Sequence, residues 1–135
     1  MLTTEAVSRV TSGGGTLNVP DKRVVKKITI GQAVRQGDIY LHRVEDDHPR
    51  GDESENKQLA VGATRGSRHL AVGANCFEPQ AVPSWVDANQ PLGPLIVAQD
   101  SFTVTHPEHA HCELPRGTYQ VTHQMDPRTR QRVED

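Results

Sequence analysis

The sequence predicts an all-β fold: a small antiparallel β-sandwich or barrel with an extended N-terminal arm and a short polar C-terminal tail. From residue 24 onward, turn residues separate short runs rich in β-branched residues. The runs recur at intervals of roughly eight to twelve positions, which is the spacing of strands in small sandwiches and barrels. Residues 37–44 place successive side chains on two faces, as a strand does. Few segments have a helical period, so we expect mostly antiparallel sheet.

Residues 1–23 are expected to form an arm outside the core. They contain few large apolar side chains, three consecutive glycines at 13–15, and Pro20. Such a segment cannot bury an apolar face of its own. A polar arm of this kind is most readily ordered by a neighbouring subunit or another partner. The β-domain is therefore expected to span residues 24–125.

Seven strands are expected within this domain. The run VVKKITI predicts the first, and GDIYLHRV predicts the second, with Ile39 and Leu41 on one face and Tyr40 and His42 on the other. Segment 45–57, EDDHPRGDESENK, has no large apolar side chain and is expected to be a solvated acidic loop. The expected strands are residues 24–30, 37–44, 58–62, 68–73, 95–98, 101–105 and 118–124.

The middle of the chain contains a short repeat. The sequence LAVGA occurs at residues 59–63 and again at 70–74, with Gly66 between the copies, so a β-hairpin is expected here. Four prolines then interrupt residues 79–94, which predicts an irregular loop whose Trp85 fills part of the core.

The last predicted strands follow this loop. The apolar run LIVA and the segment SFTVT predict two of them. Pro115 and Gly117 then predict a tight turn into the final strand, whose Tyr119 is expected to pack in the core. Residues 126–135 are expected to form a polar C-terminal tail, in which segment 126–132 is basic.

The composition limits the classes of function. The chain has 135 residues, 34% of them hydrophobic and only 4% aromatic, which allows one modest core. A net charge of −2 argues against a nucleic-acid partner, because such proteins gain affinity from a cationic face. There is no long apolar run and no signal peptide, so we expect a cytoplasmic protein without a membrane partner. Cys76 and Cys112 are expected to be free thiols.

One dense cluster of chemical groups lies at residues 105–113, THPEHAHCE, which contain three imidazoles, two carboxylates and a thiol. These groups are ligands of zinc and other transition metals. In an extended segment His109 and His111 share a face, and His106 joins them if Pro107 turns the chain. The candidate metal ligands are His69, His106, His109 and His111, in a cupin-like centre with an open coordination position.

Two alternatives remain for this cluster. Histidines near a strand end also form hydrogen bonds that close a loop, which is a purely structural role. Acid–base catalysis without a metal would use His109 with Glu108 or Glu113. The chain contains neither a Gly-x-Ser-x-Gly motif nor a phosphate-binding loop, and we assign no catalytic residue. The sequence therefore favours a non-enzymatic role.

The C-terminal third resembles small uncharacterised proteins of bacteria and their phages. The similarity covers residues 36–125 and rests on GSRH at 66–69, THPEH at 105–109 and LPRGTYQVTHQ at 114–124. The relatives have a further histidine where this chain has Ser67, and Arg-Glu-Tyr where it has Met125 and Asp126. The matching histidines are His69, His106 and His109, and the resemblance implies no activity.

These observations lead to three hypotheses of function. The first is a structural or assembly protein without a cofactor, of the kind that decorates or cements a phage-type capsid. It would bind a second copy or a shell protein through its arms, and it would lie on a virion or particle surface. The alternative is a cupin-like enzyme or metal-binding module that holds zinc or another transition metal. The third is a regulatory module that presents the acidic segment 45–57 to a basic partner.

Overall fold

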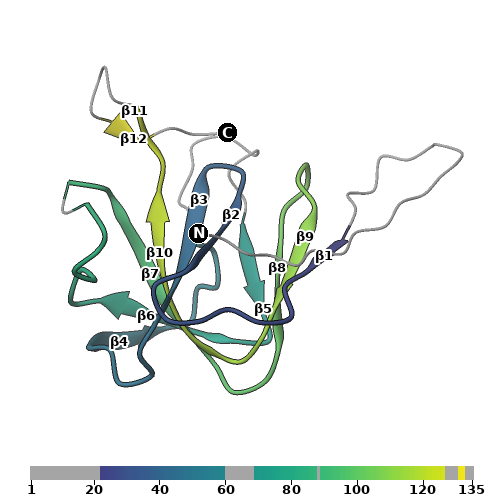
Figure 1. The fold of residues 1–135 in the computed structure, drawn as a ribbon, viewed down its shortest axis with the longest axis horizontal. Helices are drawn as coiled ribbons and strands as arrows, with labels where there is room; N and C mark the ends of the chain where they lie inside the picture. Colours follow the sequence, from purple (N-terminus) through teal and green to yellow (C-terminus); the bar gives the residue numbers. More distant parts are fainter. Residues whose placement is uncertain (1–21, 60–68, 88, 127–130, 133–135) are drawn as a thin grey trace, which may run out of the picture.

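The computed structural model describes residues 22–59, 69–87, 89–126 and 131–132, and within them the chain is all-β (Figure 1). A four-stranded sheet and a six-stranded sheet pack against each other, and a small two-stranded sheet lies near the C-terminus. The predicted β-sandwich is confirmed, whereas the alternative of a closed barrel is wrong because both large sheets are open. Among the described residues, no helix is long and apolar enough to cross a membrane.

The four-stranded sheet has the order β1-β9-β8-β5. Its strands are β1 (Lys22–Val24), β9 (His111–Leu114), β8 (Phe102–Thr105) and β5 (Leu70–Val72). Strand β1 pairs in parallel with β9, and the other pairs are antiparallel. Ala71, Val104 and Cys112 point from this sheet into the core, each no more than 2% exposed.

The six-stranded sheet has the order β2-β3-β10-β7-β6-β4, and all of its pairs are antiparallel. Its strands are β2 (Ala33–Gln36), β3 (Ile39–Val44), β10 (Gly117–His123), β7 (Leu92–Ala98), β6 (Asn75–Pro79) and β4 (Arg50–Ser54). All seven residues of the central strand β10 are buried. This sheet is therefore covered on both faces around β10.

The core lies between the two sheets. Leu41, Ile96 and Val121 of the six-stranded sheet contribute to it and are fully buried. Tyr119, also 0% exposed, confirms its predicted place: its ring meets Phe102 edge-on at 5.4 Å, and its hydroxyl donates to the Pro115 carbonyl at 2.8 Å. The prediction for Trp85 is wrong, because its side chain is 44% exposed in the loop between β6 and β7.

The other face of the six-stranded sheet is covered by loops. The Thr118 hydroxyl of β10 donates a hydrogen bond of 3.3 Å to Asp46 Oδ1, in the loop after β3. That loop reaches the β6–β7 loop through a contact of 3.1 Å between the His48 ring and the Ala81 carbonyl. Gln120 and Thr122 on this face are consequently 0% exposed.

Several predicted strand boundaries need correction. The strand expected at 24–30 is present only as Lys22–Val24, because the chain then leaves β9 with Lys26 and Lys27 in solvent. The segment expected as a loop at 45–57 contains β4, which pairs with β6 through an irregular register. Strands β2, β6 and β9 were not predicted. Strand β2 forms a hairpin with the following β3, β9 pairs with β8 and β1, and β6 pairs with β4 and β7.

The expected hairpin around Gly66 lies mostly outside the described residues. Its two described ends do approach each other, since Gln58 forms a bridge with Leu70 and the Leu59 amide donates to the His69 carbonyl at 2.7 Å. Residues 58–59 do not form a strand of their own. Residues 1–21 of the expected arm also lie outside the description. In the tail, β11 (Met125–Asp126) pairs with β12 (Gln131–Arg132). Both cysteines are buried and free, as predicted.

Candidate functional site

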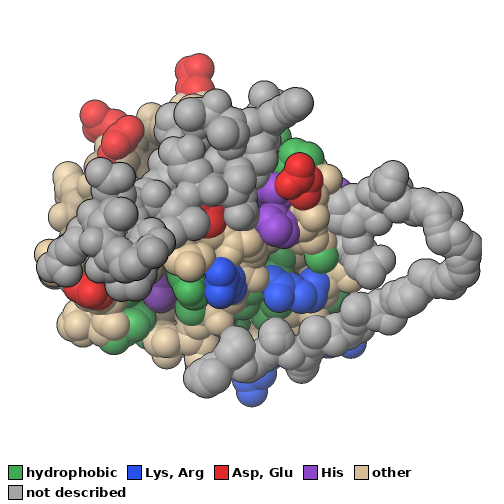
Figure 2. Space-filling model, turned by 90° about the horizontal axis from the view of Figure 1, so that it is seen from above, with side chains coloured by type: hydrophobic (Ala, Val, Ile, Leu, Met, Phe, Trp, Pro, Cys, Tyr) green, Lys and Arg blue, Asp and Glu red, His purple; other side chains and the backbone are tan. Residues whose placement is uncertain are grey.

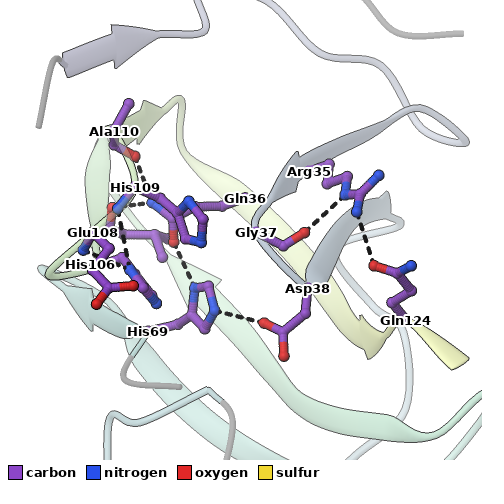
Figure 3. A network of polar contacts seen from close by, with 11 residues as sticks. Arg35, Gln36, Gly37, Asp38, His69, His106, Glu108, His109, Ala110 and Gln124 are labelled. Carbon is purple, nitrogen blue, oxygen red and sulfur yellow. Dashed lines mark hydrogen bonds and ion pairs between the residues drawn. The ribbon is translucent and has the colours of Figure 1, made fainter. Parts of the chain in front are cut away.

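Three of the four candidate histidines lie together between the two large sheets (Figure 3). His69 directly precedes β5, and His106 and His109 lie in the connection between β8 and β9. The ring centroid of His106 is 4.4 Å from that of His69 and 4.3 Å from that of His109. His69 is 0% exposed and His106 is 1% exposed, whereas His109 is partly exposed. The pairing of β5 with β8 thus brings His69 to the THPEH segment.

The fourth candidate, His111, lies outside this cluster. It begins β9 and pairs with Lys22 of β1. Its neighbour Cys112 points into the core, so alternation along the strand turns His111 to the outer face of the sheet. The expectation that His109 and His111 share a face does not hold, because His109 precedes the strand.

Gln36, at the end of β2, connects the cluster to the six-stranded sheet. Its Nε2 amide donates to the carbonyl oxygens of Val104 at 3.0 Å and Ala110 at 2.8 Å. Both of these partners are acceptors, so the Gln36 Oε1 atom must be the one that lies 2.7 Å from His69 Nδ1. His69 therefore donates this hydrogen bond. Through Gln36 the edge of one sheet is joined to β5, β8 and the β8–β9 connection.

Asp38, in the turn between β2 and β3, engages the other nitrogen of His69. The His69 Nε2 to Asp38 Oδ1 distance is 2.9 Å, and the two side chains are 0% and 1% exposed. Because Nδ1 already donates to Gln36, this second contact needs one proton, carried by His69 or by Asp38. Burial lowers the pKa of His69, and the hydrogen bond to Asp38 opposes that effect. Asp38 Oδ2 is buried and has no hydrogen-bond partner among the described residues.

His106 has a local structural task. Its Nδ1 atom accepts hydrogen bonds from the backbone amides of Glu108 at 2.9 Å and His109 at 3.2 Å. These bonds close the turn that leads into β9. Since Nδ1 is an acceptor, the neutral His106 ring carries its proton on Nε2. The loop-closing role expected for histidines at a strand end is therefore present at this position.

This hydrogen-bonding pattern bears on metal binding. A metal ligand must offer a nitrogen lone pair, but both nitrogens of His69 face oxygen partners and the Nδ1 lone pair of His106 faces two amides. Within the part of the chain that the structure describes, no group of three or more His, Cys, Asp or Glu side chains is placed to hold a metal ion. A metal would have to replace these hydrogen bonds, and its binding here stays a prediction.

The cysteine beside the cluster is poorly suited to nucleophilic chemistry. Cys112 is 0% exposed, and burial raises the pKa of its thiol even though Arg23 lies 3.8 Å from the sulfur. A thiol in that state is a weak nucleophile. Solvent reaches the cluster instead at His109, which lines a groove of about 190 Å³ together with Arg23 and Gly37. Histidine side chains are visible at the surface in Figure 2.

The sequence interpretation missed Gln36 and Asp38. Buried amides and carboxylates are uncommon, and neither residue lies near the THPEH segment in the sequence. The available signal was the triplet QGD between two apolar runs, where Gly37 takes a positive φ of 59° and turns β2 into β3. That turn places polar side chains on either side of the glycine close to His69.

The comparisons with known proteins give one match. A family described as Domain of unknown function (DUF8820) matches residues 35–124. These residues include Gln36, Asp38 and the three clustered histidines. No curated protein matches the chain, and no solved structure matches it.

Proposed function

The chain belongs to the family described as Domain of unknown function (DUF8820), and we propose that it is a non-enzymatic assembly protein. It binds a second copy of itself through the outer face of the four-stranded sheet. The resemblance to phage proteins makes a capsid or particle surface the first context in which to look for this assembly. The proposal concerns the protein–protein contact and requires no cofactor.

The supporting observation is the exposed outer face of β5 in the four-stranded sheet. Leu70 and Val72 of β5 are 40% and 55% exposed on this face. They pair with Thr105 and Thr103 of β8, which are partly exposed. Leu70 and Val72 lie two residues apart on one face of β5 and so form a small apolar patch, which is more typical of a contact surface than a single exposed apolar residue.

The opposite edge of the same sheet receives the N-terminal segment. Strand β1 is a three-residue strand that adds in parallel to β9. Lys22 forms an ion pair of 2.8 Å with Glu113, and Val25, directly after the strand, is 3% exposed in the core. Addition of a strand to a sheet edge is a common way for a segment to join one protein to another. Lys22, the first described residue, therefore lies at the edge of the sheet opposite to β5.

The test uses the full chain and a charged variant of the face. We expect the wild type to be multimeric by light scattering at micromolar concentration. The double variant Leu70→Lys, Val72→Lys should be monomeric, because burying two ammonium groups in the contact is costly. Ile30→Lys is the matched control, since Ile30 is 49% exposed outside the sheet. A monomeric wild type, or a multimer that resists the double substitution, would contradict the proposal.

A second candidate function is a transition-metal centre, with zinc first. The observation that favours it is the packing of three imidazoles, His69, His106 and His109, next to the unpartnered Oδ2 atom of Asp38. Elemental analysis of untagged protein tests it directly. One equivalent of metal, lost in His69→Ala and retained in His111→Ala, would support this function, and metal-free protein would rule it out.

A further inference from the structure

A groove of about 340 Å³ lies on the outer face of the six-stranded sheet, away from the histidine cluster. It is lined by Tyr40 of β3, Gln124 after β10, and Asp87 and Gln90 of the loop between β6 and β7. Tyr40 alternates with the core residues Ile39 and Leu41, so its ring faces away from the core. Among the described residues, the lining of the groove thus combines one aromatic side chain with three polar ones.

The polar groups of the groove are held in fixed orientations. Arg35 donates to Gln124 Oε1 at 2.8 Å (Figure 3), and arginine is only a donor, so Gln124 Nε2 is left to donate to a ligand. Gln90 Nε2 donates to the His123 carbonyl at 3.2 Å, which leaves Gln90 Oε1 as an acceptor. Neither of these two remaining atoms has another hydrogen bond within residues 22–59, 69–87, 89–126 and 131–132.

Asp87 adds a second acceptor. Its Oδ1 atom accepts from the Asn89 amide at 2.9 Å, and Oδ2 remains for a ligand. Arg35, at 5.5 Å over the Tyr40 ring, already donates to Gly37 and Gln124. The groove therefore offers a donor and acceptors near the Tyr40 ring, and the Asp87 carboxylate and the Arg35 guanidinium carry opposite charges.

We propose that this groove binds a neutral carbohydrate. A hydroxyl group both donates and accepts a hydrogen bond. Adjacent sugar hydroxyls can therefore accept from the Gln124 amide and donate to the oxygen atoms of Gln90 and Asp87. The C–H face of a sugar ring packs on an aromatic side chain such as Tyr40. An anionic ligand would meet the Asp87 carboxylate, and a purely apolar ligand would leave the oriented amides unpaired. Trp85, two residues before Asp87 and 44% exposed, lies on the same loop for contact with longer chains.

The experiment is native affinity electrophoresis of the full chain in gels that each contain one neutral polysaccharide: dextran, mannan, galactan or xylan. At least one of these should retard the wild type. Tyr40→Ala and Gln90→Ala should each weaken that binding by about tenfold, because each removes one ring contact or hydrogen bond. Tyr40→Phe keeps the ring and should bind within about twofold of the wild type.

Gln99→Ala is the matched control for Gln90→Ala. Gln99 is an exposed carboxamide directly after β7. Its neighbour Ala98 pairs with Gly117, the first residue of β10, whereas Gln124 of the groove follows the other end of that strand. It should bind like the wild type, and thermal melting should show that every variant is folded. Retardation by none of the four polysaccharides, or equal retardation of Tyr40→Ala and wild type, would overturn the proposal. Saturable binding of adenosine monophosphate in its place would assign the groove to a nucleobase and overturn it as well. None of these outcomes depends on the self-association of the other sheet.

Discussion

The two large sheets of this protein differ in how far their faces are covered. The six-stranded sheet is covered on both faces around its central strand β10, and every residue of that strand is buried. The inner face of the four-stranded sheet lies in the core, while Leu70 and Val72 are exposed on the outer face of its strand β5. A sheet with two covered faces supplies stability, while an open face with apolar side chains is available for a partner. The difference separates the part of the molecule that holds the fold from the part that we propose makes contacts.

The prediction with the largest expected effect compares two alanine substitutions, one in each large sheet. Tyr119→Ala in β10 should lower the free energy of unfolding by about 3–5 kcal/mol, because it leaves a large cavity against Phe102. Thr103→Ala, on the open face of β8, should change it by less than about 0.5 kcal/mol. Urea unfolding followed by circular dichroism measures both. Similar losses from the two substitutions would contradict the division between the sheets.

A second test concerns the polar connection between the sheets. Asp38→Ala should cost about 3 kcal/mol, because it removes one partner of a fully buried pair. Asp38→Asn should recover at least half of that loss, because its carboxamide donates to the Nε2 lone pair of a neutral His69. The same urea titration applies. If the two variants are equally unstable, the carboxylate charge and not the hydrogen bond holds the connection.

The smallest expected effect concerns pH. Burial lowers the pKa of His42, whose ring lies 2.9 Å from the Thr122 hydroxyl on the covered face of the six-stranded sheet. The unfolded chain then binds the proton more readily than the native chain, so stability is present above the ordinary histidine pKa and declines as the pH falls from 7 toward 5. His42→Gln should reduce the drop in melting temperature between pH 7 and pH 5.

The control for this measurement is His111→Gln, which removes an imidazole from the four-stranded sheet. Its side chain lies on the uncovered face. An equal reduction of the acid-induced drop in both variants would show that burial of the His42 ring is not its cause.

The sequence was sufficient for the fold class and for the strands with regular alternation. Strands β3, β8 and β10 lie close to their predicted positions because their β-branched and apolar residues alternate locally. Strand β4, with the sequence RGDES, has no such pattern. It is a strand because β6 offers backbone partners and because Arg50 lies 5.0 Å over the Phe77 ring. Contacts of this kind depend on the tertiary structure and leave no local signal.

Part of the candidate site was also predictable from local sequence, and part of it depends on the tertiary structure. The density of histidines in THPEH and the separate His69 pointed to a cluster, and His69, His106 and His109 do lie together. Gln36 and Asp38 could not be assigned, because their burial follows from the packing of the β2–β3 turn against the other sheet. A turn sequence alone indicates solvent-exposed polar residues.

The parallel pairing of β1 with β9 also sets the order of events during synthesis. Lys22 is made early, but its register partner His111 is made near the end of the chain. At the usual rates of translation, the ribosome needs about 5–20 s to make the residues between them. During that interval the backbone of β1 has no β9 to pair with, so the first strand that the structure describes is among the last to join its sheet.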